Sequence, residues 1–319
     1  MALSTPPPSD ALPLLPLLGG IEAGGTKYVC AVAYDPAKPL LEARFPTGEP
    51  RETVAKAAAF FREAAAIHGS IRSLGIGTFG PARIDPAAPD FGTILTTPKA
   101  GWSGFPLVEE LRKALGMDLP VAFETDVNAA ALGESVHGAA RGVRNVAYIT
   151  VGTGIGGGLL GDGRLLHGRM HPEIGHLAVP DLDAAYGKAT QVCPFHASCL
   201  EGRASGPAIE TRWGKPGHEL PDDHPAWGLE AQYLAIGCLQ LTAAWSPDLI
   251  LLGGGVSQKS GLIDRVRDEL VKLAGGYWDL PPMEDYLKLP ALDQQAGIVG
   301  ALELARRARG KTSEDAPAL

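Results

Sequence analysis

Two histidines and two cysteines near the middle of the chain have the side chains and the spacing of a metal site. Cys193, His196 and Cys199 follow one another at every third residue, and His176 lies upstream of them. Two thiolates and two imidazoles fill the tetrahedral shell of a structural Zn²⁺, whereas a catalytic zinc keeps one position open. These four residues are therefore predicted to hold a structural zinc ion. The alternative, four unconnected core residues, does not account for the regular spacing.

Two acidic residues flank the predicted ligands. Glu173 lies three residues before His176, and Glu201 lies two residues after Cys199. An ion that staples the two segments would bring both carboxylates to one place, where Glu173, His176 and Glu201 are predicted to bind a substrate. His171 is not expected to be an equal ligand, because its spacing from His176 is not the His-Glu-x-x-His pattern.

Glycine-rich turns occur twice, each between two apparent strands. Gly24-Gly25-Thr26-Lys27 is not a Walker A loop, because a strand follows where that motif needs a helix. Gly152-Thr153-Gly154 is followed by a strand too, which excludes the dinucleotide fingerprint. The backbone N–H groups of such turns can bind phosphate, although the first turn alone is equally well an ordinary hairpin. As a pair, the two turns are predicted to grip a nucleotide from opposite sides.

A third glycine cluster ends a strongly apolar strand near residue 252. Three successive glycines allow a flat ligand such as adenine to approach the backbone, or they form a tight turn. We expect this cluster to complete the nucleotide site. The predicted ATP-binding residues are Gly24, Gly25, Thr26, Lys27, Gly152, Thr153, Gly154, Gly253, Gly254 and Gly255.

An aspartate stands between an apparent strand and an apparent helix. Thr125-Asp126-Val127-Asn128 follows the apolar residues 121–123, and ligands of open α/β sheets bind at that end of a strand. Asp126 is therefore a candidate general base. Its use as a helix N-cap explains the residue equally well.

Composition excludes several classes of function. The chain has 319 residues, is 45% hydrophobic and carries a net charge of -8, so neither nucleic acid nor an anionic membrane is an expected partner. No apolar run is long enough to span a bilayer. Cys30 and Cys238 lie in apolar runs and are expected to be buried thiols, so a reducing cytoplasm is the expected location.

Strands that alternate with helices, together with the repeated hairpin, predict two α/β lobes. The first lobe is expected over residues 19–125 and the second, with the zinc-binding insertion, over 126–293. A C-terminal helix at about 294–309 is expected to pack back on the first lobe. Residues 1–18, rich in proline and leucine, and the end of the chain after 310 are expected to be disordered tails.

Taken together, the motifs resemble the ROK family of sugar kinases (repressors, open reading frames, kinases), and most closely its bacterial zinc-containing fructokinases. The resemblance covers residues 20–308. The matching segments are Glu22 to Lys27, Thr125 to Ala130, Gly152 to Gly158, His171 to His176, Cys193 to Gly202 and Pro247 to Val256. Glu22 stands where most members carry aspartate, as in the fructokinase branch.

This resemblance implies an actin-like (ribonuclease H-like) two-lobed α/β fold with a cleft between the lobes. It implies an ATP-dependent hexose kinase that uses Mg²⁺ with ATP, with Asp126 as the general base, and it suggests a homodimer. Fructose, phosphorylated to fructose 6-phosphate, is the expected sugar, ahead of mannose and then of glucose or N-acetylated hexosamines. Many glucose-specific members have asparagine where this chain has Thr125.

Three other classes are weaker matches. Repressors of the family carry a helix-turn-helix before the first glycine turn, whereas only residues 1–19, rich in proline, precede the first strand here. A zinc metallohydrolase would lose activity at once when chelated, before it unfolds. A non-catalytic sugar-binding module would release no ADP with any sugar.

Overall fold

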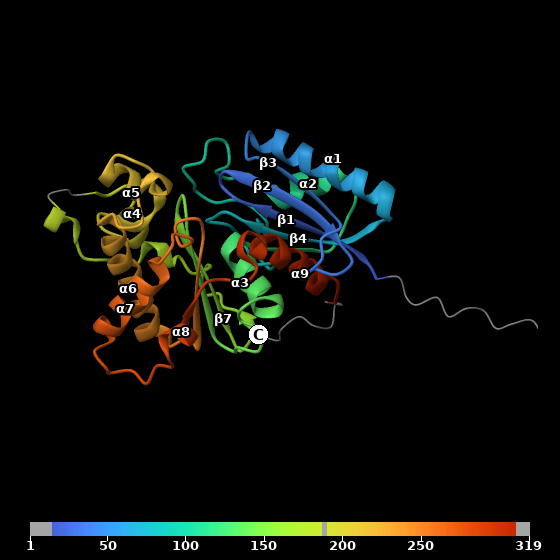
Figure 1. Cartoon of the computed structure of the whole chain (residues 1–319). Coiled ribbons are helices and arrows are strands. Elements are labelled where there is room, and N and C mark those ends of the chain that lie inside the picture. Colours follow the sequence, from blue (N-terminus) through green and yellow to red (C-terminus); the bar gives the residue numbers. More distant parts are fainter. Residues whose placement is uncertain (1–14, 187–189, 311–319) are drawn as a thin grey trace, which may run out of the picture.

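The computed structural model describes residues 15–186 and 190–310. Most of each predicted tail, residues 1–14 and 311–319, lies outside the described residues. The first strand begins at Leu17, so the last two residues of the predicted N-terminal tail belong to the sheet. Figure 1 shows two lobes, one at the upper right and one at the left, with helices between them.

The first sheet has the strand order β3-β2-β1-β4-β5. β1 (Leu17–Ala23) and β2 (Lys27–Ala33) form the first predicted hairpin, and β3 (Leu41–Pro46) pairs antiparallel with β2. β4 (Ile71–Thr78) runs parallel to β1, and β5 (Val121–Thr125) runs parallel to β4. The parallel strands β1 and β4 are buried along most of their length, although β1 carries Glu22 and β4 carries Arg72 and Ser73.

The second sheet repeats this topology. β6 (Val146–Val151) and β7 (Ile155–Gly161) form the second hairpin, and β8 (Arg164–Leu165) extends it. β9 (Leu249–Gly253) runs parallel to β6, and β10 (Leu287–Lys288) lies at the edge. The predicted internal duplication is thereby confirmed, since each lobe places an antiparallel hairpin beside two parallel strands.

Helices cover both sheets. The α-helices are α1 (Pro50–His68), α2 (Leu107–Leu115), α3 (Asp126–His137), α4 (Leu200–Ala204), α5 (Gly206–Trp213), α6 (Ala226–Trp245), α7 (Leu262–Ala274), α8 (Met283–Tyr286) and α9 (Ala296–Gly310). The short 3-10 helices are η1 (Ile174–His176), η2 (Asp183–Tyr186), η3 (Gly217–Glu219) and η4 (Asp293–Gln295). α1 and α2 pack on each other at the first sheet, and α6 and α7 pack on each other at the second.

α3 and α9 lie side by side between the two sheets, and α9 also packs on β1 and β4 (Figure 1). Glycines make this contact close enough for backbone to touch backbone. A Cβ at Gly300 would collide with the carbonyl oxygen of Ala129, and one at Gly133 would lie 2.6 Å from the carbonyl oxygen of Ala296. α9 therefore binds α3 and the first sheet at once.

This close contact yields a stability prediction. Gly300→Ala should lower the free energy of unfolding by about 1–3 kcal/mol or more, because α3 and α9 must separate to admit the methyl group. Gly228→Ala is the matched control: it lies in helix α6 with nothing within 4 Å of the added Cβ, so stability should stay the same or rise. Urea unfolding of both variants measures the difference. Equal stability of the two variants would contradict the tight α3–α9 contact.

Candidate active site

Asp126 stands at the carboxyl edge of the first sheet. The last residues of β1, β4 and β5 lie in register, since Ala23 pairs with Thr78 and Thr78 pairs with Thr125. The first glycine turn and Asp126 therefore leave the sheet at the same edge, as predicted for the ligand-binding end of parallel strands.

The start of α3 leaves the carboxylate of Asp126 available. Thr125, not Asp126, is the N-cap of the helix, because its hydroxyl oxygen accepts the N–H of Asn128 at 3.2 Å. The alternative use of Asp126 as N-cap is therefore wrong. Asp126 is the first residue of the helix, and its Oδ1 accepts the N–H of Val127 at 2.9 Å.

The environment of Asp126 opposes its negative charge. Although the residue keeps some solvent exposure, protein surrounds its carboxylate, and this burial raises the pKa of Asp126 from 3.8 to about 7. The negative charges of Glu22 and Glu173 raise this pKa further, whereas the N–H of Val127 lowers it. A carboxylic acid with a pKa near neutrality can accept and release a proton at physiological pH.

Glu173 and Glu201, which are distant in sequence, lie within electrostatic reach of each other. Burial, followed by the charge of Glu201, raises the pKa of Glu173 to about 7. Oε2 of Glu201 accepts the N–H of Ile155 at 2.9 Å, which joins the start of α4 to the second glycine turn. A Cβ at Gly154 would lie only 2.7 Å from that oxygen, so a side chain at this position would displace the carboxylate of Glu201. The three predicted acids thus come to one region.

The glycine turns occupy the ends of the strands in both sheets. Gly24 donates its N–H to the carbonyl of Lys27 at 2.9 Å and closes the first hairpin. Gly152 donates to Gly154 at 2.9 Å in the second. Gly254, which directly follows β9, has φ +86°, and a Cβ there would collide with the carbonyl oxygen of Val151. The second and third glycine turns are therefore neighbours at one end of the second sheet.

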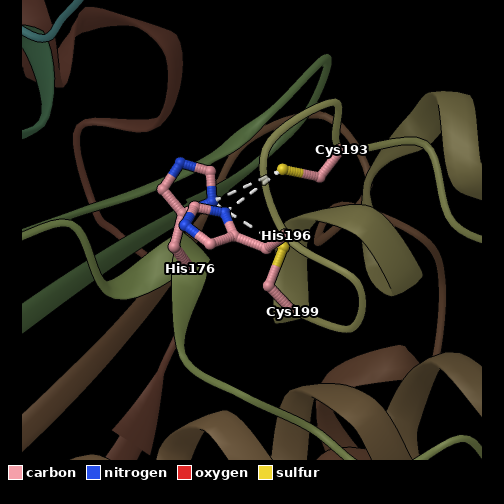
Figure 2. Close-up of side chains that lie close together, drawn as sticks. All are labelled: His176, Cys193, His196 and Cys199. Atoms are coloured by element: carbon pink, nitrogen blue, oxygen red, sulfur yellow. Dashed lines mark hydrogen bonds between the residues drawn. The ribbon is translucent and has the colours of Figure 1, made fainter.

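The four predicted metal ligands converge on one point, as Figure 2 shows. Their donor atoms all lie within 4.8 Å of one another. Nδ1 of His176 is 3.9 Å from Sγ of Cys193 and 3.7 Å from Sγ of Cys199. Nδ1 of His196 is 3.4 Å from Sγ of Cys193.

These separations fit a tetrahedral zinc ion. With Zn–S of about 2.3 Å and Zn–N of about 2.0 Å, neighbouring ligands in a tetrahedron lie about 3.3–3.8 Å apart. The three separations of 3.4–3.9 Å lie close to this range, and no pair of donor atoms in the cluster is more than 4.8 Å apart. Pairing between Ala178 and Cys199 holds the two ligand-bearing segments together.

Several residues next to Asp126 were not predicted from the sequence as site residues. Nε2 of His167 lies 3.0 Å from Oε1 of Glu124, and Nδ2 of Asn128 donates to Oε2 of Glu124 at 2.9 Å. Glu124 and Asn128 belong to the segment that carries Asp126, and nothing else in the sequence indicates that they are site residues. His167 enters from beyond β8, so no local pattern connects it with that segment.

Glu22 also faces this region. Among residues 15–186 and 190–310, its buried Oε2 has no hydrogen-bond partner. A Cβ at Gly297 would lie 2.6 Å from the carboxyl carbon of Glu22, which places that carboxylate against the start of α9. Burial raises the pKa of Glu22, and Lys27 lowers it. The backbone N–H of Ile298 lowers this pKa too, so the carboxylate has a protein donor, while its Oε2 remains available for a cation or its water shell.

Comparison with known proteins agrees with this arrangement. The sequence pattern of the ROK family matches residues 18–308. The chain belongs to the ROK family. It is 39% identical over 292 residues to a fructokinase of Pediococcus pentosaceus, with 92% of this chain and 98% of the relative covered. It is 40% identical over 298 residues to a fructokinase of Zymomonas mobilis, with the same coverage of 92% and 98%.

A solved structure of the ROK family has the same fold. The ROK hexokinase from Thermus thermophilus superposes with a TM-score of 0.72 at 30% identity, covering 91% of this chain and 98% of that structure. The predicted actin-like two-lobed fold is confirmed. Within the described part of the chain, no helix has both the length and the apolar character needed to cross a membrane.

The raised pKa of Asp126 makes stability depend on pH. The unfolded acid ionises near pH 3.8 and the folded one near 7, so stability falls as the pH rises through this window. Asp126→Asn keeps an oxygen for the N–H of Val127 and removes the charge. Its melting temperature at pH 8 should exceed that of the unchanged protein, by roughly 2–4 °C per kcal/mol of relieved repulsion.

The difference should shrink towards pH 4, where folded Asp126 is protonated. Asp118→Asn is the control, because the side chain of Asp118 is 94% exposed and its replacement should leave the melting temperature unchanged. Thermal unfolding between pH 4 and 8 gives both curves. A lower melting temperature for Asp126→Asn than for the unchanged protein at pH 8 would contradict an unfavourable negative charge at Asp126.

Proposed function

We propose that this protein is an ATP-dependent fructokinase, which transfers the γ-phosphoryl group of ATP to the C6 hydroxyl of fructose and releases ADP and fructose 6-phosphate. The observation that carries the proposal is the position of Asp126, a carboxylate of raised pKa between a glycine turn and two further acids. Membership of the ROK family and identities of 39% and 40% to fructokinases over 92% of the chain support it.

Asp126 is the proposed general base. Its carboxylate accepts the proton of the C6 hydroxyl as that oxygen bonds to the γ-phosphorus, and the bond from phosphorus to the β-phosphate oxygen breaks. A pKa of about 7 suits this task, because roughly half of the molecules carry the ionised carboxylate at neutral pH, and that carboxylate is basic enough to take a proton. General-base catalysis of this kind contributes about 10²–10⁴-fold to the rate.

The glycine turns are the proposed nucleotide site. The N–H groups of Gly24 and Gly152 close the turns, so the backbone N–H groups beside them, including those of Gly25 and Gly154, bind the phosphates of ATP together with the hydroxyls of Thr26 and Thr153. Gly253 to Gly255 border the adenosine, and Lys27 adds a positive charge near Glu22. Mg²⁺, when bound with ATP, neutralises the phosphate charge, and the buried carboxylate of Glu22 fits as a group that holds it or its water shell.

Glu173, His176 and Glu201 are the proposed sugar ligands. Their carboxylates and imidazole pair with hydroxyls, and a buried polar site of this kind rejects sugars that lack the matching hydroxyl. Fructose is proposed ahead of glucose because Thr125 stands where many glucose-specific members have asparagine, and because the chain is 39% and 40% identical to two fructokinases. A mannose or glucose kinase of the same family is the second candidate, and a non-catalytic sugar-sensing regulator the third.

A structural zinc ion is proposed at His176, Cys193, His196 and Cys199. The ion joins the segment that carries Glu173 to the segment that carries Glu201, which positions both acids for the sugar. Nδ1 of His176 faces the sulfurs, and its Nε2 points away from them (Figure 2). The same ring can therefore bind the ion through Nδ1 and a sugar hydroxyl through Nε2. The lobe boundaries at residues 19–125 and 126–293, the homodimer and the cytoplasmic location stay predictions.

The activity is tested by measuring ADP release with Mg-ATP and a panel of fructose, mannose, glucose and N-acetylated hexosamines. Fructose should give the highest kcat/KM. Asp126→Asn should lose at least about 100-fold in kcat while calorimetry still detects fructose binding. Asp118→Asn should keep the rate of the unchanged protein, because that side chain is on the surface.

The possible results separate the three candidates. A near-normal kcat for Asp126→Asn would remove this residue as the base. A higher kcat/KM with mannose or glucose would select the second candidate. Sugar binding without ADP release for any hexose would select the regulator.

The zinc site is tested by elemental analysis. Purified protein should contain one zinc per chain, and Cys199→Ala should lose the metal and the stability together, because the binding free energy of a structural zinc is folding free energy. Cys238→Ala is the matched control, since Cys238 is a buried thiol that lies outside the cluster. That variant should keep its zinc. Zinc-free, stable wild-type protein would contradict the site.

A further inference from the structure

His171 is buried between the two lobes. Its side chain is 3% exposed, and its ring packs on the segment that follows β4, where a Cβ at Gly80 would lie 3.3 Å from Cε1. Nε2 accepts the backbone N–H of Ala82 at 3.2 Å. Ala82 belongs to the hydrophobic core of the first lobe. On the other side of the ring, Nδ1 lies 3.4 Å from Oε1 of Glu173.

These two contacts determine which nitrogen carries the proton. A nitrogen that accepts an N–H has no hydrogen of its own, so the neutral ring of His171 carries its hydrogen on Nδ1. Burial lowers the pKa of His171, which favours the neutral ring. The hydrogen on Nδ1 therefore lies on the side of the ring that faces the backbone of Pro172, whose hydrogen bond raises this pKa, and Oε1 of Glu173 at 3.4 Å.

Glu173 needs such a donor to keep its place. Its side chain is 37% exposed, and the charge of Glu201 repels its carboxylate. A partly exposed carboxylate can turn away from a second negative charge unless a hydrogen-bond donor in a fixed position holds it. The ring of His171 is such a donor, because its other nitrogen is bound to the backbone at Ala82.

We propose that His171 is a positioning residue for the sugar: it holds Glu173 in the orientation that receives the sugar hydroxyl and ties that orientation to the first-lobe segment at Ala82. The proposal deepens the proposed function and rests on it. It makes affinity for the sugar depend on a contact between the lobes, through a residue that touches neither the sugar nor the metal.

Two substitutions separate the two nitrogens. His171→Asn places an amide N–H near the position of Nδ1, so it keeps the donor to Glu173 and loses the acceptor for Ala82. His171→Gln places an amide oxygen near the position of Nε2, so it keeps the acceptor for Ala82 and loses the donor to Glu173. Zinc content and melting temperature of each variant report whether it is folded.

The kinetic expectation differs between the two variants. His171→Gln should raise the KM for fructose about tenfold, the effect of losing one hydrogen bond to a charged group, and should leave the KM for ATP unchanged. His171→Asn should stay closer to the wild-type KM for fructose. In a Glu173→Gln background, His171→Gln should add nothing to the KM for fructose, because the carboxylate it acts through is gone.

Equal KM values for the two His171 variants, or the same tenfold effect in the Glu173→Gln background, would overturn the proposal. If His171→Gln does not fold, the ¹⁵N spectrum of the wild-type histidines decides: a hydrogen on Nδ1 of His171 supports the role, and a hydrogen on Nε2 overturns it. Wild-type protein that phosphorylates no hexose would contradict the proposed function instead, so the two failures are distinguishable.

Discussion

A half-neutralised carboxylate at the start of a buried helix is the constraint around which the site is built. Asp126 receives one backbone N–H, from Val127, and the positive end of the α3 dipole favours its charge. Burial and the charges of Glu22 and Glu173 oppose it and prevail, since the pKa rises to about 7. The protein thus keeps a carboxylate whose negative charge is unfavourable where its two sheets meet, and the surrounding structure must hold it there.

Two distant parts of the chain hold Asp126 and the acids around it in place. α9, at the C-terminal end, packs its glycines against α3 and leaves room at Gly297 for the carboxylate of Glu22. The cluster of His176, Cys193, His196 and Cys199 joins the segments that carry Glu173 and Glu201. α9 therefore packs against Glu22, and the cluster brings together Glu173 and Glu201. Glu22 and Glu173 act on the charge of Asp126, and Glu201 acts on that of Glu173. Stability and site geometry depend on the same contacts.

Much of this was predictable from local pattern. The repeated hairpin around Gly24 and Gly152 predicted the duplicated topology, because a glycine turn between alternating strands determines an antiparallel pair wherever it occurs. The every-third spacing of Cys193, His196 and Cys199 predicted the cluster, because few other functions require thiols and imidazoles in that order. A helix opening within residues 125–128 was predicted too, but neither its first residue, Asp126, nor its cap, since Thr125 and Asp126 are both good capping residues.

By itself, the sequence determined the two glycine-turn hairpins, the clustering of His176, Cys193, His196 and Cys199 and the identity of the candidate base, since each depends on residues close together in the chain. Only the tertiary structure decided which acids face one another, that His167 reaches Glu124, and that the ring of His171 connects Ala82 with Glu173. Those contacts join segments tens of residues apart. Their distances depend on how two sheets and the α3–α9 pair pack, and no local periodicity encodes that packing.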